Sequence, residues 1–261
     1  MLRLIAALLI LAVSATAEPL PLAPPLIPAP GFLLLGPAKA RGVLVWLHGA
    51  YDLAQFSDPP PVQDWAARLA GRGYDVWRLN RIPRQDPIAE GGDKLLAGLR
   101  GIRAAGYRRV IVAGFSRGGF IGLAALAHPD LADAVAAISP AAHGPRPERR
   151  AEALAAFEAM MDRAQTSRFA LVQLNDDALD PNPELRAGTA RVMAARTHSA
   201  LLQIFRPMVP RGHMGSDEPE FDALFGGCLA DFLDGLVGPD ACGPAAGALT
   251  TTSLHPPSSQ Q

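Results

Sequence analysis

The chain has 261 residues, of which 49% are hydrophobic and 19% charged, and its formal net charge is −1. This length and composition suit one globular domain with a sizeable core, so a two-domain protein is not expected. The near-neutral charge, without any run of lysine or arginine, excludes the basic footprint with which proteins bind nucleic acid or anionic membranes.

The first 17 residues have the three parts of a secretory signal peptide. Arg3 gives a charged start, residues 4–13 are apolar, and an A-x-A cleavage site ends at Ala17. The apolar part is shorter than the ~20 residues of a transmembrane helix, so an uncleaved anchor is only the alternative interpretation. No cysteine follows the site, so a lipoprotein anchor is not indicated. We expect a secreted or periplasmic protein that begins at Glu18 and has no stable membrane insertion.

Residues 18–30 are rich in proline and leucine and are expected to be an extended lead-in. Over residues 31–242, short apolar runs alternate with helical patterns. Strands are predicted at residues 32–35, 43–47, 75–79, 110–113, 134–138, 169–174 and 201–205. Helices are predicted at residues 62–70, 94–104, 118–127, 151–164, 183–196 and 218–236. Near-continuous apolar strands alternating with helices predict an α/β domain with a doubly wound, mostly parallel sheet.

A G-x-S-x-G pattern at residues 114–118 follows the strand predicted at 110–113 and precedes a helix. A serine between a buried strand and a helix sits on a sharp, strained turn, and Gly114 and Gly118 remove Cβ atoms that would collide there. The pattern alone also occurs in ordinary turns that cap a helix. The strand–turn–helix order makes Ser116 the candidate nucleophile.

Three further motifs occur along the chain: Leu-His-Gly-Ala at 47–50, an acidic cluster at 175–181, and Gly-His-Met-Gly at 212–215. Together with the serine motif they resemble an α/β-hydrolase, of the compact kind similar to dienelactone hydrolases and small secreted carboxylesterases. The resemblance covers nearly the whole mature chain. It implies the α/β-hydrolase fold with a minimal lid or none.

The resemblance also implies a catalytic triad. Serine needs a base within hydrogen-bond reach and an acid that orients the base. His213 is the candidate base, because the chain order serine, acid, histidine is the one expected for this fold. The acid is expected on the loop at 175–181, where the family's spacing to a following proline favours Asp177. Asp180 is held in reserve and Asp176 ranks last.

The oxyanion hole is expected to combine backbone N–H groups from two loops. Arg117 opens the helix after the nucleophile, where its N–H can donate to an oxyanion. The N–H of Ala50 or Tyr51 is expected to join it, with His48 and Gly49 shaping that loop and Gly49 allowing close approach. Tyr51 is interpreted either as an aromatic wall of the acyl pocket or as an ordinary exposed side chain.

Two features bear on the substrate. Arg78, Arg81 and Arg84 follow a predicted strand and are interpreted as a solvated face with modest ion pairs, the alternative being contact with an anionic substrate. Residues 140–168 have room for one helix but not for a large lid domain. This shortness favours small soluble esters over long-chain triglycerides.

The two cysteines lie near the end of the chain. Cys228 falls in the last predicted helix and Cys242 in a Gly/Pro-rich segment after it. In an oxidising compartment we expect one disulfide between them, with two free thiols as the alternative. Neither has the spacing of a metal or redox site. Residues 243–261 are small and polar and are expected to be disordered.

The sequence therefore predicts a serine hydrolase that cleaves small carboxylic esters through an acyl-enzyme, with no cofactor and no metal. Its expected partner is a small-molecule ester rather than nucleic acid, and no oligomeric state is indicated. Peptidase, amidase or lactonase activity on the same triad stays open, because all use the same acyl-enzyme chemistry. A non-catalytic ligand-binding protein of the same fold also stays open.

Overall fold

A computed structural model describes residues 26–50, 60–81, 87–143, 146–180 and 182–243. The predicted signal peptide, Tyr51, Arg84 and nearly all of the C-terminal segment predicted to be disordered lie outside these residues. In the described part, seven strands form one sheet in the order β1-β3-β2-β4-β5-β6-β7. The strands are β1 (Leu26–Pro28), β2 (Gly42–Leu47), β3 (Tyr74–Leu79), β4 (Val110–Phe115), β5 (Ala134–Ile138), β6 (Arg168–Gln173) and β7 (Ala200–Phe205). All neighbouring pairs are parallel except β1 with β3.

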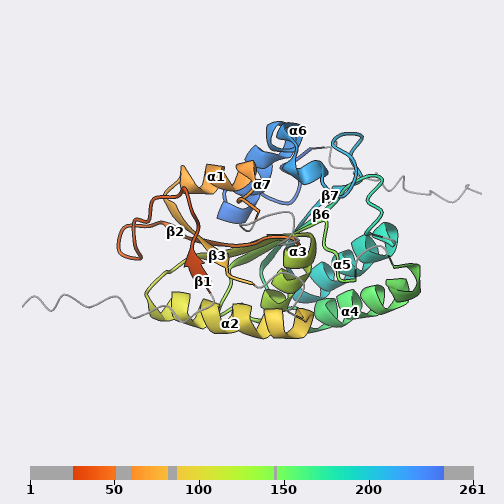
Figure 1. The fold of residues 1–261 in the computed structure, drawn as a ribbon, viewed down its shortest axis with the longest axis horizontal. Helices are drawn as coiled ribbons and strands as arrows, with labels where there is room; N and C mark the ends of the chain where they lie inside the picture. Colours follow the sequence, from red (N-terminus) through yellow and green to blue (C-terminus); the bar gives the residue numbers. More distant parts are fainter. Residues whose placement is uncertain (1–25, 51–59, 82–86, 144–145, 181, 244–261) are drawn as a thin grey trace, which may run out of the picture.

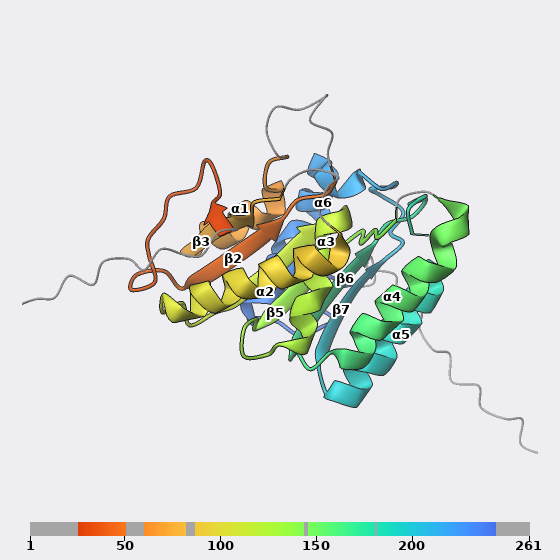
Figure 2. The same ribbon diagram turned by 60° about the horizontal axis from the view of Figure 1, so that its bottom comes forward.

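Helices cover both faces of the sheet (Figure 1). One layer contains α1 (Asp64–Ala70), α6 (Pro219–Phe221), the π-helical turn η4 (Asp222–Gly226) and α7 (Gly227–Asp234). The other contains α2 (Ile88–Ala104), α3 (Ser116–Gly122), η1 (Leu123–Ala127), α4 (Arg150–Arg163) and α5 (Pro183–Thr197), which come forward in Figure 2. Two 3₁₀ turns, η2 (Pro147–Arg149) and η3 (Gly215–Asp217), complete the described elements. The predicted doubly wound α/β fold is confirmed.

Each face of the sheet packs against its own apolar core. Val43 and Val45 of β2 belong to the core beneath α2, α3 and α4, whereas Leu44 and Trp46 of the same strand belong to the core beneath α1 and α7. All four side chains are buried. This explains why β2 is an uninterrupted apolar run, since both faces of a doubly covered strand avoid water.

The prediction of a strand at residues 32–35 is wrong. These residues are not in a strand, and Leu33 is 82% exposed. The segment is held by a side chain instead, because the carboxylate of Asp75 accepts hydrogen bonds from the backbone N–H of Leu35 (2.7 Å) and Gly36 (2.9 Å). An apolar run thus looked like a strand although its backbone pairs with a carboxylate.

The first strand instead lies within the segment expected to be a lead-in. β1 pairs antiparallel with β3 at the edge of the sheet, where a three-residue strand ending in Pro28 is tolerated. Leu26 is 3% exposed and packs on Gly98 of α2, where a Cβ would come within 2.5 Å of the Leu26 side chain. Part of residues 18–30 therefore belongs to the packed domain.

Several helix boundaries differ from the prediction. α2 begins at Ile88 rather than at residue 94, and its early glycines allow close packing: a Cβ on Gly91 would lie 2.7 Å from Ile121 Cδ1 of α3. The single final helix predicted at 218–236 is divided into α6, η4 and α7. Among the described helices, none is long and apolar enough to cross a membrane.

The predicted disulfide is confirmed. Cys228 in α7 is bonded to Cys242, and their Cα atoms are 5.2 Å apart. Both residues pack against the core beneath α1 and α7, so the bridge ties the segment after α7 to that core.

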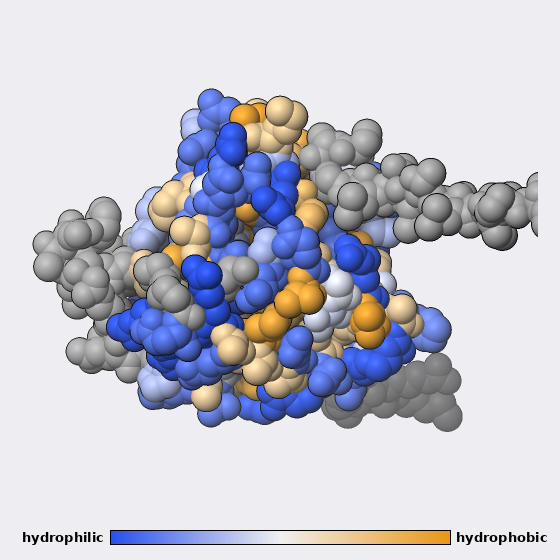
Figure 3. Space-filling view, turned by 90° about the vertical axis from the view of Figure 1, so that its right-hand side faces the viewer, coloured by the Kyte–Doolittle hydropathy of each residue, from blue (hydrophilic) through white to orange (hydrophobic). Residues whose placement is uncertain are grey.

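The two ends of the parallel strands form opposite edges of the domain. α2 runs from right to left in Figure 1, so the strands that it joins end at the right. Figure 3 views the molecule from this side and shows apolar side chains among hydrophilic ones near the middle of the face. In doubly wound sheets, this carboxyl edge is where ligands bind.

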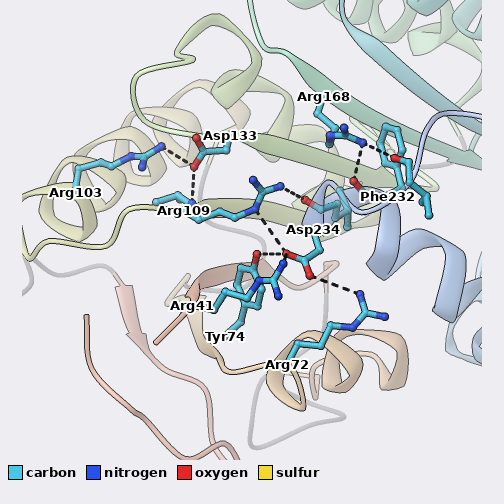
Figure 4. A network of polar contacts seen from close by, with 12 residues as sticks. Arg41, Arg72, Tyr74, Arg103, Arg109, Asp133, Arg168, Phe232 and Asp234 are labelled. Atoms are coloured by element: carbon cyan, nitrogen blue, oxygen red, sulfur yellow. Dashed lines mark hydrogen bonds and ion pairs between the residues drawn. The ribbon is translucent and has the colours of Figure 1, made fainter. Parts of the chain in front are cut away.

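The amino edge contains a buried carboxylate among arginines (Figure 4). Asp234, at the end of α7, accepts a hydrogen bond from Tyr74 Oη at 2.5 Å and forms ion pairs with Arg41 at 2.9 Å and Arg72 at 3.9 Å. Burial, followed by the hydrogen bond to Asp234, raises the pKa of Tyr74 to about 12. The side chain of Asp234 is fully buried, so these partners supply what water cannot.

Arginines from the amino ends of two strands also cap α7. Arg109 donates to the Leu233 carbonyl at 2.7 Å, and Arg168 donates to the Phe232 carbonyl at 2.9 Å. The last carbonyls of a helix have no partner within the helix and carry partial negative charge, which cations at this end stabilise. The amino edge therefore holds the C-terminal helix in place.

Candidate active site

Ser116 occupies a strained turn between β4 and α3. Its φ is 54°, in the left-handed region that non-glycine residues rarely adopt. A Cβ on Gly114 would lie 2.5–2.7 Å from the backbone of Gly118 and Gly119. A Cβ on Gly118 would overlap the carbonyl oxygens of Leu47 and His48. Gly114 thus leaves room for the turn itself, and Gly118 lets the turn pack against the end of β2.

Three of the predicted site residues meet in a chain of hydrogen bonds. Ser116 Oγ is 2.8 Å from His213 Nε2. His213 Nδ1 is 2.9 Å from Asp177 Oδ1 and 3.0 Å from Asp177 Oδ2. These distances fit an imidazole that donates from Nδ1 to the carboxylate and accepts the serine hydroxyl at Nε2. The Asp177 side chain is 1% exposed and that of His213 is 16% exposed, so the carboxylate is shielded from solvent while the imidazole is partly accessible.

The loop carrying His213 is attached to the loop carrying Asp177. Asn175 and Arg211 form a parallel β-bridge, and the Gly212 N–H donates to the Asn175 carbonyl at 2.7 Å. Gly212 has a φ of 75°, which glycine adopts without strain. The Phe115 ring packs on the imidazole of His213 with centroids 5.1 Å apart. These contacts fix where His213 stands above the sheet.

The three candidate acids have different partners. Asp177 accepts the Leu179 N–H at 2.8 Å in addition to its contacts with His213. Asp176 is exposed and pairs with Arg211. Asp180 is 5% exposed, and its carboxylate lies 3.2 Å from Arg186 Nη1. Of the three aspartates, only Asp177 contacts His213.

The loop expected to form the second half of the oxyanion hole lies against Ser116. A Cβ on Gly49 would come within 3.2 Å of Ser116 Cβ, so a larger residue would press on the turn. Ala50 is exposed at the end of the described segment, and Tyr51 lies beyond it. The roles of Arg117, Ala50 and Tyr51 as oxyanion donors therefore stay predictions.

His48 and Arg81 brace this loop from inside. His48 is 2% exposed, and its Nδ1 lies 2.7 Å from the Gly49 carbonyl oxygen. Burial, reinforced by the positive charge of Arg81, lowers the pKa of His48 to about 4, so the ring is neutral at physiological pH. Arg81 is 5% exposed and donates to the His48 carbonyl. The interpretation of Arg81 as part of a solvated face is therefore wrong. Its side chain is buried because it hydrogen-bonds the backbone of the loop at His48.

Sequence reasoning missed Gln63, which supports the segment after His213. Its Nε2 donates to Ser216 Oγ at 2.8 Å and to Asp217 Oδ1 at 2.5 Å, and its Oε1 accepts from Trp65 Nε1 at 2.9 Å. Burial raises the pKa of Asp217. No motif marks a lone glutamine before a helix, so only the three-dimensional arrangement reveals it.

The similarity of this chain to known proteins lies in its fold. No protein-family model matches it, and no curated protein sequence matches it. It is similar to the solved acylaminoacyl peptidase of Pyrococcus horikoshii (TM-score 0.56, 13% identity, covering 75% of this chain and 37% of that one). It is also similar to the Pyrococcus furiosus esterase Pf2001 (TM-score 0.53, 16% identity, covering 75% and 83%). A Klebsiella pneumoniae protein described as a dienelactone hydrolase matches with a TM-score of 0.53 and 15% identity, covering 75% and 88%.

The chain spans about a third of the length of the peptidases that it matches, and most of the length of the esterase and of the Klebsiella protein. At such identities the similarity concerns the fold and not the substrate. The strand order, the helices on both faces and these structural neighbours agree with the resemblance seen in the motifs. The chain has the α/β-hydrolase fold.

Proposed function

We propose that the protein is a serine hydrolase that cleaves small carboxylic esters. Ser116 is the nucleophile, His213 the general base and Asp177 the acid that orients it. The observation that carries the proposal is the unbroken chain of hydrogen bonds from Ser116 Oγ through His213 to Asp177. Serine is a weak nucleophile at neutral pH, and this arrangement is what activates it.

The reaction follows from the proton positions. As Ser116 Oγ attacks the ester carbonyl carbon, its proton passes to His213 Nε2, and the carbonyl oxygen becomes an oxyanion. The N–H of Arg117, joined by that of Ala50 or Tyr51, stabilises this oxyanion. His213 then gives its proton to the departing alkoxide, leaving the acyl group on Ser116. Water, deprotonated by His213, then attacks the acyl carbon, the bond to Ser116 Oγ breaks, and His213 returns its proton to Oγ as the carboxylic acid leaves.

The preference for small esters rests on the surroundings of the site. Of the described residues between β5 and β6, only η2 and α4 form regular elements, which leaves little material for a lid. Met208, Val209 and Met214, on the loop that carries His213, are 86%, 55% and 57% exposed. They offer apolar surface to an acyl or alcohol group near the base.

Labelling and turnover test the proposal together. We expect a fluorophosphonate probe to modify the wild-type protein at Ser116 and to leave Ser116→Ala unlabelled, because labelling needs an activated serine. A series of p-nitrophenyl esters of rising acyl length, with lactones and peptide amides alongside, should be hydrolysed fastest at short acyl chains. Faster cleavage of peptide amides or lactones would instead favour those activities, and a folded protein that resists the probe would favour a ligand-binding role.

We also propose that the protein is exported and acts in the periplasm or outside the cell. The A-x-A site at Ala17 supports this location. The disulfide between Cys228 and Cys242 supports it independently, since disulfides persist in oxidising compartments.

A further inference from the structure

A fully buried ion pair lies beneath the loop that carries Asp177. Arg186, in the first turn of α5, is 1% exposed, and Asp180 is 5% exposed. The guanidinium stands over the rings of Phe120 and Phe157, 5.9 Å and 5.5 Å from their centroids. Burial raises the pKa of Asp180 and lowers that of Arg186, while each charge stabilises the other. Apolar residues of similar volume usually fill such a position at no loss of stability, so the pair calls for another explanation.

Asp180 connects this pair to the acid loop. The Asp180 N–H donates to the Asp177 carbonyl at 3.1 Å, closing a turn between the two aspartates. Its carboxylate accepts a hydrogen bond from Gln173 Nε2 at 2.7 Å, at the end of β6. The position of the Asp177 backbone thus depends on where the Asp180 side chain is held.

The same guanidinium reaches the other side of the site. Arg186 Nη1 donates to the Pro140 carbonyl at 2.8 Å, in the segment that follows β5. The next residue, Ala141, donates its N–H to the Ser116 carbonyl at 3.0 Å. One buried side chain therefore joins the segment bonded to Ser116 with the turn that holds Asp177.

We propose that Arg186 is a positioning residue of this hydrolase, which sets the distance between the nucleophile and the acid by joining their two loops through Pro140 and Asp180. The proposal rests on the function proposed above, and Arg186 contacts neither His213 nor a substrate. A shift of about 1 Å in a reacting group can slow an enzyme by about 10²-fold, so such a strut affects the chemical step. Substrate binding would change little.

The test is a double variant, Arg186→Met with Asp180→Asn. Replacing Arg186 alone would leave a buried, unpaired carboxylate and could unfold the domain, whereas the double variant removes both charges together. Its new amide oxygen can still accept from Gln173. We expect a folded protein whose kcat and rate of fluorophosphonate labelling fall about 10- to 100-fold, with KM changed by less than about threefold.

Arg186→Lys keeps the charge, but its single ammonium ends a more flexible side chain and lacks the planar guanidinium that lies over Phe120 and Phe157. We expect it to lose about 3- to 10-fold in both rates. The loss is smaller than in the double variant because the cation between the two loops is kept but is held less firmly. If the double variant fails to fold, this variant decides: a wild-type rate would overturn the proposal and a rate in the expected range would support it.

The matched control is Glu184→Gln. Glu184 lies in the same turn of α5 and pairs with Arg206, but the two side chains are 63% and 41% exposed. Its loss should change both rates less than about twofold. A folded double variant that is labelled as fast as the wild type would overturn the role of Arg186 alone. A wild-type protein that resists the probe would instead refute the proposed function, and this inference with it.

Discussion

In the proposed reaction a proton passes between Ser116 Oγ and His213 Nε2, so both residues are needed for the same step. We expect Ser116→Ala or His213→Ala to lower kcat by about 10⁴- to 10⁶-fold while the fold is kept, because triad members act as a unit. Ester hydrolysis and thermal melting, measured on the same samples, check this. His128→Gln, which changes a histidine at the end of η1, should keep the wild-type rate. More than a tenth of the activity in folded Ser116→Ala would remove Ser116 as the nucleophile.

Asp177 and Asp176 have different partners, His213 and Arg211 respectively. Asp177→Asn should lower kcat by about 10⁴-fold, because an amide leaves His213 without its orienting carboxylate. Asp176→Asn removes only an exposed ion pair with Arg211 and should have little effect. The comparison is made at saturating ester. A large loss in Asp176→Asn and a small one in Asp177→Asn would reverse the assignment.

The neutral, buried ring of His48 links stability to pH. Its pKa is about 4 in the folded protein against 6.5 for an unperturbed histidine, so between these values only the unfolded chain binds the proton. Acidification from pH 6.5 to 4 should therefore lower the free energy of unfolding by up to about 3 kcal/mol through this residue. Urea titrations across this range should show a shallower pH dependence in His48→Asn. Parallel pH curves for the two proteins would contradict this account.

At the residue scale, the sequence could single out only those candidate residues that a motif or the chain order marks. Ser116, His213 and Asp177 stand out because their spacing and chain order reflect a required geometry. Arg81 and Arg186 carry no such mark. Their burial depends on packing between distant segments, and an arginine read alone is expected to be exposed.

At the scale of elements, the strand–turn–helix unit around Ser116 depends on glycine where backbones touch. Gly118→Ala would force a Cβ into two carbonyl oxygens of β2 and the loop after it, neither of which can move away freely. We expect a loss of stability at the upper end of about 1–3 kcal/mol, and a loss of activity as the turn shifts. Thermal melts and labelling rates measure both.

Gly122→Ala is the control in the same helix. Its Cβ would lie 3.6 Å from Val112 Cγ1, an ordinary contact. Alanine favours the helical conformation, so this variant should match or exceed wild-type stability by up to about 1 kcal/mol. Equal effects of the two substitutions would show that helix propensity, and not the close contact, decides the result.

Six of the seven strands could be predicted because each is a largely apolar run that a helical pattern separates from the next. The segment at 32–35 misled the prediction because Asp75, forty residues away, takes the place of a neighbouring strand. β1 was missed because prolines surround it and only its edge position makes them acceptable. Local patterns cannot report either long-range contact.

At the scale of the whole molecule, export and the disulfide can be tested on the secreted protein. It should begin at Glu18, and its intact mass should be about 2 Da below that of the reduced chain, since the bridge removes two hydrogens. Cys228 and Cys242 are 14 residues apart in sequence, and closing such a loop stabilises a protein by about 3 kcal/mol. Reduction should lower the melting temperature by about 6–12 °C and leave the labelling of Ser116 intact. A mature chain that retains residues 1–17 would refute cleavage.

The cluster of arginines and Tyr74 around Asp234 makes the stability of the protein depend on pH in the alkaline range. Arginine side chains keep their charge there, so Tyr74 is the group that titrates. Its pKa is about 12 in the folded protein and about 10 when unperturbed, so its contribution to stability is complete below pH 10 and is lost as the pH rises towards 12. Ionised, it would face the carboxylate of Asp234 as a second anion. The contacts that hold the end of α7 would then weaken at high pH, at the edge of the sheet opposite Ser116.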